Sequence, residues 1–185
     1  MISLEIFMQM LFLLAPAGIA NTAPVWGAKL PWLRRWNTPL DCGLKYGGQR
    51  LLGDNKTWRG LALGAFFGGL SGAVLATLSS LIPYVGRVDV FSSEINLVLL
   101  GVLLGCGALA GDALKSFCKR RIGLRPGQSW PVMDQIDYIL GAYIITGFIF
   151  DLTPTHYLVG LLTYALVHPF ISYAAYLLRL KRDKF

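Results

Sequence analysis

The chain has 185 residues, of which 55% are hydrophobic and only 15% charged, and its formal net charge is +7. A single compact unit is expected at this length, and so apolar a composition argues against a water-soluble protein. The positive charge does not indicate a nucleic-acid partner, because the basic residues flank apolar stretches and form no independent folded domain.

Five apolar stretches recur along the chain. A bilayer core of about 30 Å needs about 20 residues of helix, and stretches near this length lie at residues 4–23, 61–81, 95–115, 138–152 and 157–178. The fourth is the shortest, and a tight turn at Thr153–Thr155 joins it to the fifth. The sequence therefore predicts an all-α integral membrane protein, a bundle of five transmembrane helices in a single domain over residues 1–185.

Basic residues predict the orientation of the bundle, because Lys and Arg gather in short loops on the cytoplasmic side. Seven of the 17 lie at 29–59, five at 115–125 and four at 179–184, and only Arg87 lies elsewhere. The N-terminus is thus expected outside, the C-terminus inside, and two sizeable loops, about 25–60 and 116–137, in the cytoplasm. Anionic lipid headgroups and nucleotide phosphates are the expected partners of this charge.

The first stretch has an alternative interpretation as a signal peptide, because Gly18-Ile19-Ala20 resembles a cleavage site. No basic residue precedes the stretch, and the positive charge after it favours an N-outside orientation. A retained first helix is preferred.

The first predicted loop combines Trp26, Trp32 and Trp36 with basic residues, as is typical of the headgroup region of a membrane. An interfacial helix is expected there. It would gather anionic lipid or simply anchor the chain.

Small residues predict how the second and third stretches pack. Gly60, Gly64, Gly68 and Gly72 share a helix face, and Gly101, Gly105 and Ala108 form a matching face that reaches Asp112 one turn further on. These glycines are explained by packing alone. Packing the two stretches together brings the segment before Gly60 close to Asp112.

Carboxylates at a membrane edge are costly and usually functional. Asp112 lies near the inner end of the third stretch, and Asp134 and Asp137 lie three apart on one helical face where the fourth begins. All three acids are expected at the same membrane face.

Cations and a hydroxyl follow Asp112 along one helical stripe at offsets of three, four and seven: Lys115, Ser116 and Lys119. Arg120, Arg121 and Arg125 extend the positive charge. Acids beside so many cations suit a metal-bound polyphosphate, with Asp112, Asp134 and Asp137 as ligands of Mg²⁺ and the basic side chains on phosphate. The structural alternative is that Asp112 pairs with Lys115 or Lys119, and that Asp134 and Asp137 favour a helix N-terminus.

A second constellation, residues 53–60, stands immediately before the second stretch and is typical of a helix start. Asp54, Asn55 or Thr57 can cap, while Lys56 and Arg59 add charge beside free backbone N–H groups that favour phosphate. Capping beside a membrane span explains the segment equally well. The glycine spacing of a Walker loop is absent.

Together, Lys56-Thr57-Trp58-Arg59-Gly60 and the string from Gly111-Asp112 through Lys115-Ser116 to Asp134-Gln135-Ile136-Asp137 resemble the CTP-dependent cytidylyltransferases of membrane lipids. The likeness is closest to the short archaeal form, the CDP-archaeol synthases, and more distant to the CDP-diacylglycerol synthases. The chain departs from the latter at Gln128-Ser129-Trp130, where they have a His-Gly-Gly run, and at Gln135 between the aspartates.

The resemblance implies transfer of CMP from CTP to an isoprenoid glycerol phosphate lipid, 2,3-bis-O-geranylgeranylglycerol 1-phosphate, giving CDP-archaeol and pyrophosphate with Mg²⁺ as cofactor. The expected site is at the cytoplasmic face of the cell membrane, in one multi-pass catalytic domain. Asp112, Asp134, Asp137, Lys115 and Lys119 would be catalytic, and the nucleotide would be bound by Asn55, Lys56, Thr57, Arg59, Ser116, Arg120 and Arg121. A homo-oligomer is left open.

Two other classes of membrane protein share some of these features. A CDP-alcohol phosphotransferase also uses acids at helix ends, but its Asp-Gly-x-x-Ala-Arg pattern is missing. A membrane ion or solute transporter would be expected to carry polar residues deeper in the bilayer.

Overall fold

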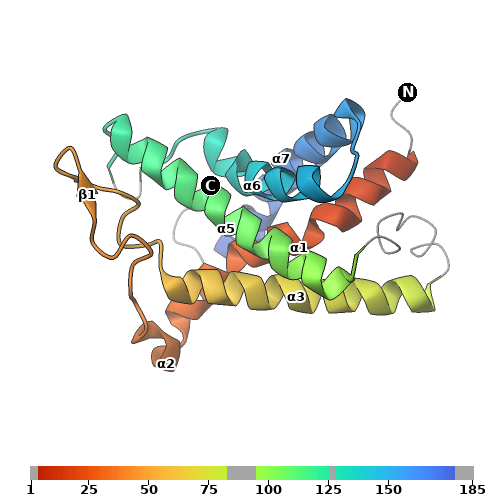
Figure 1. Cartoon of the computed structure of the whole chain (residues 1–185), viewed down its shortest axis with the longest axis horizontal. Helices are drawn as coiled ribbons and strands as arrows, with labels where there is room; N and C mark the ends of the chain where they lie inside the picture. The colour runs from red at the N-terminus through yellow and green to blue at the C-terminus, as the bar shows by residue number, and fades with distance from the viewer. Residues whose placement is uncertain (1–3, 83–94, 126–127, 178–185) are drawn as a thin grey trace.

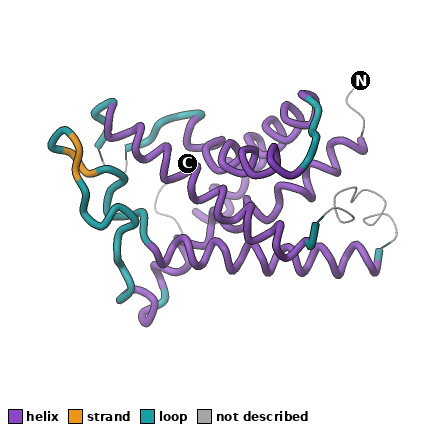
Figure 2. Tube along the Cα trace, viewed as in Figure 1, coloured by secondary structure: helices purple, strands orange, loops and turns teal. Residues whose placement is uncertain are grey.

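Five long helices make up most of the chain in the computed structural model, which describes residues 4–82, 95–125 and 128–177 (Figures 1 and 2). They are α1 (Leu4–Lys29), α3 (Trp58–Leu81), α5 (Leu97–Arg121), α6 (Met133–Ile149) and α7 (Pro154–Leu177). Within the described residues, α1, α3 and α5 are long and apolar enough to cross a membrane. The helical membrane fold is confirmed, whereas the count of five spans and their orientation stay predictions.

The observed helices extend the predicted spans where chemistry was expected. Helix α5 runs on to Arg121, so the predicted stripe from Asp112 to Lys119 lies on one helix. Helix α6 begins at Met133, which places Asp134 and Asp137 inside it and not before it. The connection before α7 ends at Thr153, two residues before the end of the predicted turn, because Pro154 is already helical. The fixed φ of proline suits the first turn of a helix. The basic tail 179–184 and Arg87 lie outside the described residues.

Helix α5 is central and contacts α3, α6 and α1 (Figure 1). The predicted glycine contact with α3 is confirmed. A Cβ atom added at Gly68 would lie 2.3 Å from the carbonyl oxygen of Gly101, and one at Gly105 would lie 2.4 Å from that of Gly64. Gly60 faces α1 instead, near Pro24. The backbones of α3 and α5 are therefore in contact, and this contact fixes the start of α3 beside the second half of α5.

A second glycine contact, which the sequence analysis missed, joins α5 to α6. A Cβ atom at Gly141 would lie 2.0 Å from the carbonyl oxygen of Gly107, and one at Gly111 would lie 2.2 Å from that of Asp137. Gly111 directly precedes Asp112. The close approach of the helices at this point therefore sets the separation between two of the three predicted acids.

Replacing Gly111 by Ala is expected to lower the rate of the CMP transfer that the family resemblance implies by about a hundredfold. The added methyl group must push α6 away and thereby misplace Asp137 relative to Asp112. Initial rates of the purified variant measure this loss. Gly147→Ala is the matched control, since its Cβ would meet only a Tyr157 hydroxyl at 3.4 Å. Equal activity of the two variants would contradict the account.

The segment between α1 and α3 is only partly the expected interfacial helix. Trp26 belongs to α1, and the separate helix α2 spans just Pro31–Arg34, with Trp32 71% exposed. Pro39 disfavours helical geometry at the residue before it, so no helix continues here. A two-residue antiparallel hairpin follows, β1 (Lys45–Tyr46) and β2 (Gln49–Arg50), a departure from the predicted all-α fold.

Candidate functional site

Three carboxylates converge on one ammonium group. Their residues belong to α5 and α6, toward the end of the bundle where α5 stops and α3 and α6 start (Figure 1). The Lys115 Nζ atom lies 3.2 Å from Asp112 Oδ1, 3.0 Å from Asp134 Oδ1 and 2.5 Å from Asp137 Oδ2. Asp112 and Lys115 come from adjacent turns of α5, and the other two acids come from the first turns of α6. The predicted meeting of acids from two helices is present in the structure.

Two further lysines complete the cluster. Lys56, from the segment before α3, pairs with Asp112 Oδ2. The Lys119 Nζ atom lies 2.6 Å from Asp134 Oδ1 and 2.9 Å from the carbonyl oxygen of Gln128, which holds the returning loop against α5. The cluster thus balances three negative charges with three positive ones.

Asp137 is the most deeply placed of the acids, with 3% of its surface exposed. Its Oδ1 atom accepts a hydrogen bond of 2.8 Å from the Tyr138 backbone N–H. Its Oδ2 atom has the Lys115 ammonium as its ion-pair partner, 2.5 Å away. Because a buried carboxylate is costly without a partner, this oxygen requires a cation beside it.

Asp134 has both a local and a long-range role. Its Oδ2 atom accepts a hydrogen bond of 2.6 Å from the Trp130 backbone N–H, just before α6 begins. This matches the helix-start alternative for that residue. Its Oδ1 atom at the same time faces Lys115 and Lys119, so helix capping does not remove Asp134 from the cluster.

Several of the predicted nucleotide-binding residues bond within the protein. Thr57 caps α3, its Oγ1 accepting a 3.1 Å hydrogen bond from the Gly60 N–H. Ser116 Oγ donates to the Asp112 carbonyl oxygen at 3.0 Å, and Arg59 Nη1 donates to that of Leu33 at 3.1 Å. Asn55 is exposed and Arg120 half-buried on the last turn of α5. Their contacts with a nucleotide stay predictions.

Arg121 connects the first loop to the end of α5. Its guanidinium donates hydrogen bonds to the carbonyl oxygens of Tyr46 at 2.6 Å and Arg50 at 3.0 Å. The same group lies 5.2 Å from the ring centres of both Tyr46 and Phe117. The β1–β2 hairpin is thereby held on α5.

The sequence analysis missed Asp41 and Arg50. The Asp41 side chain is fully buried and 2.6 Å from Arg50 Nη2. Burial raises the pKa of this carboxyl, but the Arg50 guanidinium and backbone N–H groups of the same loop outweigh it and hold the pKa well below its usual range. In the sequence, Asp41-Cys42-Gly43 is the pattern that could have predicted a structural role for Asp41, because Asp side chains often accept a hydrogen bond from the backbone N–H two residues on.

The acid cluster has the donor chemistry of a magnesium site but not yet its geometry. Over residues 4–82, 95–125 and 128–177, no group of three or more acidic, cysteine or histidine side chains is arranged to hold a metal ion as it stands. The Lys115 ammonium stands at the point the carboxylates share. Carboxylate oxygens are the ligands that Mg²⁺ prefers, and the buried Asp137 Oδ2 faces a cation already, so the residues fit such an ion.

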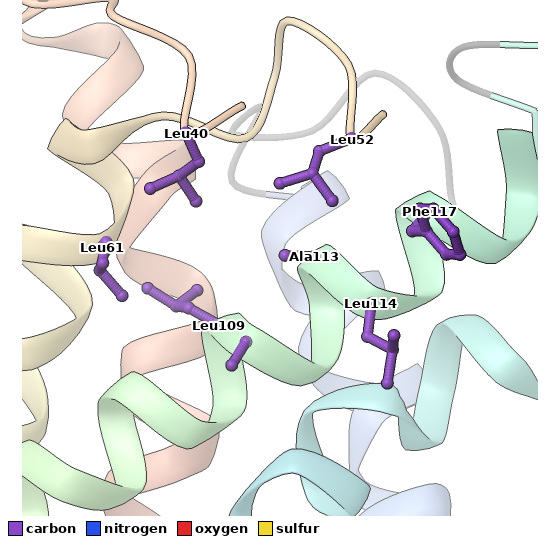
Figure 3. A pocket seen from close by; sticks show the side chains of 8 residues that line it. Leu40, Leu52, Leu61, Leu109, Ala113, Leu114 and Phe117 are labelled. Atoms are coloured by element: carbon purple, nitrogen blue, oxygen red, sulfur yellow. The ribbon is translucent and has the colours of Figure 1, made fainter. Parts of the chain in front are cut away.

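A cavity of about 520 Å³ lies between the first loop, α3 and the second half of α5 (Figure 3). Leu40 and Leu52 border it from the first loop and Leu61 from α3. Helix α5 contributes Leu109, Ala110, Ala113, Leu114 and Phe117. All of the lining residues are apolar. The cavity therefore suits hydrocarbon and does not suit a nucleotide.

Comparison with known proteins gives a consistent result. Residues 3–185 match the family described as CarS-like, CDP-archaeol synthase. A CDP-archaeol synthase from Methanopyrus kandleri is 40% identical over 176 residues, 92% of this chain and 89% of that protein. One from Methanosphaerula palustris is 43% identical over 109 residues, 58% of this chain and 62% of that protein.

A solved structure is also similar. It is described as structural insight into an intramembrane enzyme for archaeal membrane lipids biosynthesis, and it aligns with a TM-score of 0.67 at 31% sequence identity. The alignment covers 85% of this chain and 89% of that one.

Proposed function

The chain belongs to the CDP-archaeol synthase family, and from this membership and the geometry of the acid cluster we propose how it works as a CTP-dependent cytidylyltransferase. It transfers CMP from CTP to an unsaturated archaeal ether-lipid phosphate, 2,3-bis-O-geranylgeranylglycerol 1-phosphate. The products are CDP-archaeol and pyrophosphate.

One observation supports placing the reaction at the acid cluster: carboxylates from α5 and α6 all lie within 3.2 Å of the Lys115 Nζ atom. Lys56 and Lys119 flank them. Alternating acids and lysines of this kind can bind a polyphosphate together with its metal, because each sign of charge finds a partner.

The reaction needs positioning more than it needs proton transfer. A lipid phosphate oxygen, already ionised, forms a bond to the α-phosphorus of CTP, while the bond to the β-phosphate oxygen breaks and pyrophosphate leaves with that electron pair. Lys56, Lys115 and Lys119 bind phosphate oxygens and stabilise the charge of the leaving group. No general base is required.

Asp112, Asp134 and Asp137 are proposed to hold Mg²⁺ together with substrate phosphates. When bound, the ion neutralises phosphate charge and fixes the α-phosphorus for attack. Lys115, which pairs with these carboxylates in the structure, would then be available to bind a phosphate oxygen. The backbone contact of Gly111 with Asp137 keeps the two helices at the separation this requires.

In the membrane, we place all five long helices as spans, with the N-terminus outside and the acid cluster at the cytoplasmic face of the cell membrane. The distribution of Lys and Arg supports this orientation. The isoprenoid chains then remain in the bilayer, and only the lipid phosphate has to enter the polar site. The family assignment does not favour the transporter or CDP-alcohol phosphotransferase alternatives.

Lipid labelling by the purified protein tests the proposal. CTP labelled in the cytidine ring, with Mg²⁺ and the ether-lipid phosphate, is expected to give labelled lipid, and equally labelled UTP is not. The ester analogue of the lipid is included to measure acceptor preference. Ion flux without labelled lipid, or release of CMP from a CDP-lipid, would instead support one of the other two classes.

A further inference from the structure

We propose that Asp41 is a positioning residue, which closes the first loop so that Lys56 reaches the acid cluster. The inference rests on the proposed function, because Lys56 matters there through its pairing with Asp112. It adds a residue that does not touch the cluster itself.

Asp41 uses both carboxylate oxygens within the loop. Its Oδ1 atom accepts hydrogen bonds from Arg50 Nη2 at 2.6 Å and the Gly43 N–H at 3.1 Å. Its Oδ2 atom accepts from the N–H groups of Leu52 at 2.9 Å and Gly53 at 3.2 Å. Four donors, one just after Asp41 and three from the far side of the hairpin, thus meet on one fully buried side chain.

Backbone pairing carries this closure on to Lys56. The Leu40 N–H donates to the Lys56 carbonyl oxygen at 2.7 Å, and the Trp58 N–H donates to that of Thr38 at 3.0 Å. Lys56 and Trp58 are therefore held by the segment that leads into Asp41. If the carboxylate releases Leu52 and Gly53, the chain before Lys56 loses its anchor.

Residues 42–49, the hairpin part of the loop, have little apolar packing to hold them. Residues 42–49 are all exposed. Arg121 fastens the hairpin to α5 through the carbonyl oxygens of Tyr46 and Arg50. The shape of the loop therefore depends on a few polar contacts, and Asp41 makes the largest number of them.

An Asp41→Asn change tests the inference, because an amide offers an oxygen to only one side and its NH₂ group faces donors on the other. We expect kcat/KM for CTP to fall about ten- to a hundredfold, since a small displacement of a substrate-binding group is that costly. Asp54→Asn is the matched control: it removes the other partner of Arg50, a side chain that is 75% exposed.

A double-mutant cycle separates positioning from loss of stability. With Lys56 replaced by Ala, the same Asp41 change should cost less than about threefold, because the group to be positioned is gone. An equal loss in both backgrounds, or no loss with Lys56 present, would overturn the inference.

Trypsin cleavage after Lys45, Arg50 and Lys56 provides a readout without catalysis. Asp41→Asn should be cleaved faster there than the wild type and Asp54→Asn, while helical circular dichroism stays unchanged. If the wild type transfers no CMP, the proposed function fails, and loop cleavage still decides this inference. Unchanged cleavage in Asp41→Asn would then reject it.

Discussion

Changing Asp137 to Asn should reduce CMP transfer more than about a hundredfold and leave the protein folded, since one electrostatic catalytic contact can contribute that much. Asn has the same shape and can still accept the hydrogen bond from the Tyr138 N–H, so α6 should begin as before. The change removes the charge on the buried oxygen that faces Lys115. Initial rates at saturating CTP and Mg²⁺ measure the loss.

Asp151→Asn is the matched control for that variant, because Asp151 is exposed beyond the opposite end of α6. Its activity should equal that of the wild type. Near-normal transfer by the Asp137 variant, with a normal circular dichroism spectrum, would remove Asp137 from the catalytic group.

Changing Lys115 to Met should abolish most activity and also weaken the protein when metal is absent. Three carboxylates would then lose a shared cation, and removing one partner of a buried ion pair costs about 3–5 kcal/mol. Magnesium should restore part of this stability, because the ion can take the place of the missing ammonium. Thermal unfolding in detergent, with a chelator and with Mg²⁺, measures both effects.

Lys29→Met provides the comparison, since it removes an exposed charge at the end of α1. That variant should gain no more stability from Mg²⁺ than the wild type does. A Lys115 variant as stable as the wild type in chelator would contradict the view that this ammonium holds the acids together.

Much of the helical framework could be predicted because its signals are local. The length of the hydrophobic stretches predicts α1, α3 and α5. The glycines at 64 and 68 and those at 101 and 105 predict the contact between α3 and α5. Asp112 and Lys115 could be placed on one face from spacing alone. Their meeting with Asp134 and Asp137 followed from topology and is present in the structure.

What could not be predicted depends on contacts between distant residues. The backbone approach of Gly111 to Asp137 requires knowing which faces of α5 and α6 meet. The pairing of Asp41 with Arg50 requires the fold of an irregular loop, in which no hydrophobic period gives a register. Arg121 looks like a free phosphate ligand in the sequence, whereas in the structure it binds backbone carbonyl groups of that loop.

The most direct test is anomalous diffraction from crystals grown with CTP and Mn²⁺ in place of Mg²⁺. The account predicts a metal peak within about 2.3 Å of carboxylate oxygens from both α5 and α6, with the Lys115 ammonium on a phosphate oxygen. A peak bound by neither Asp112 nor Asp137, or acids that point to different sides of the bundle, would contradict it.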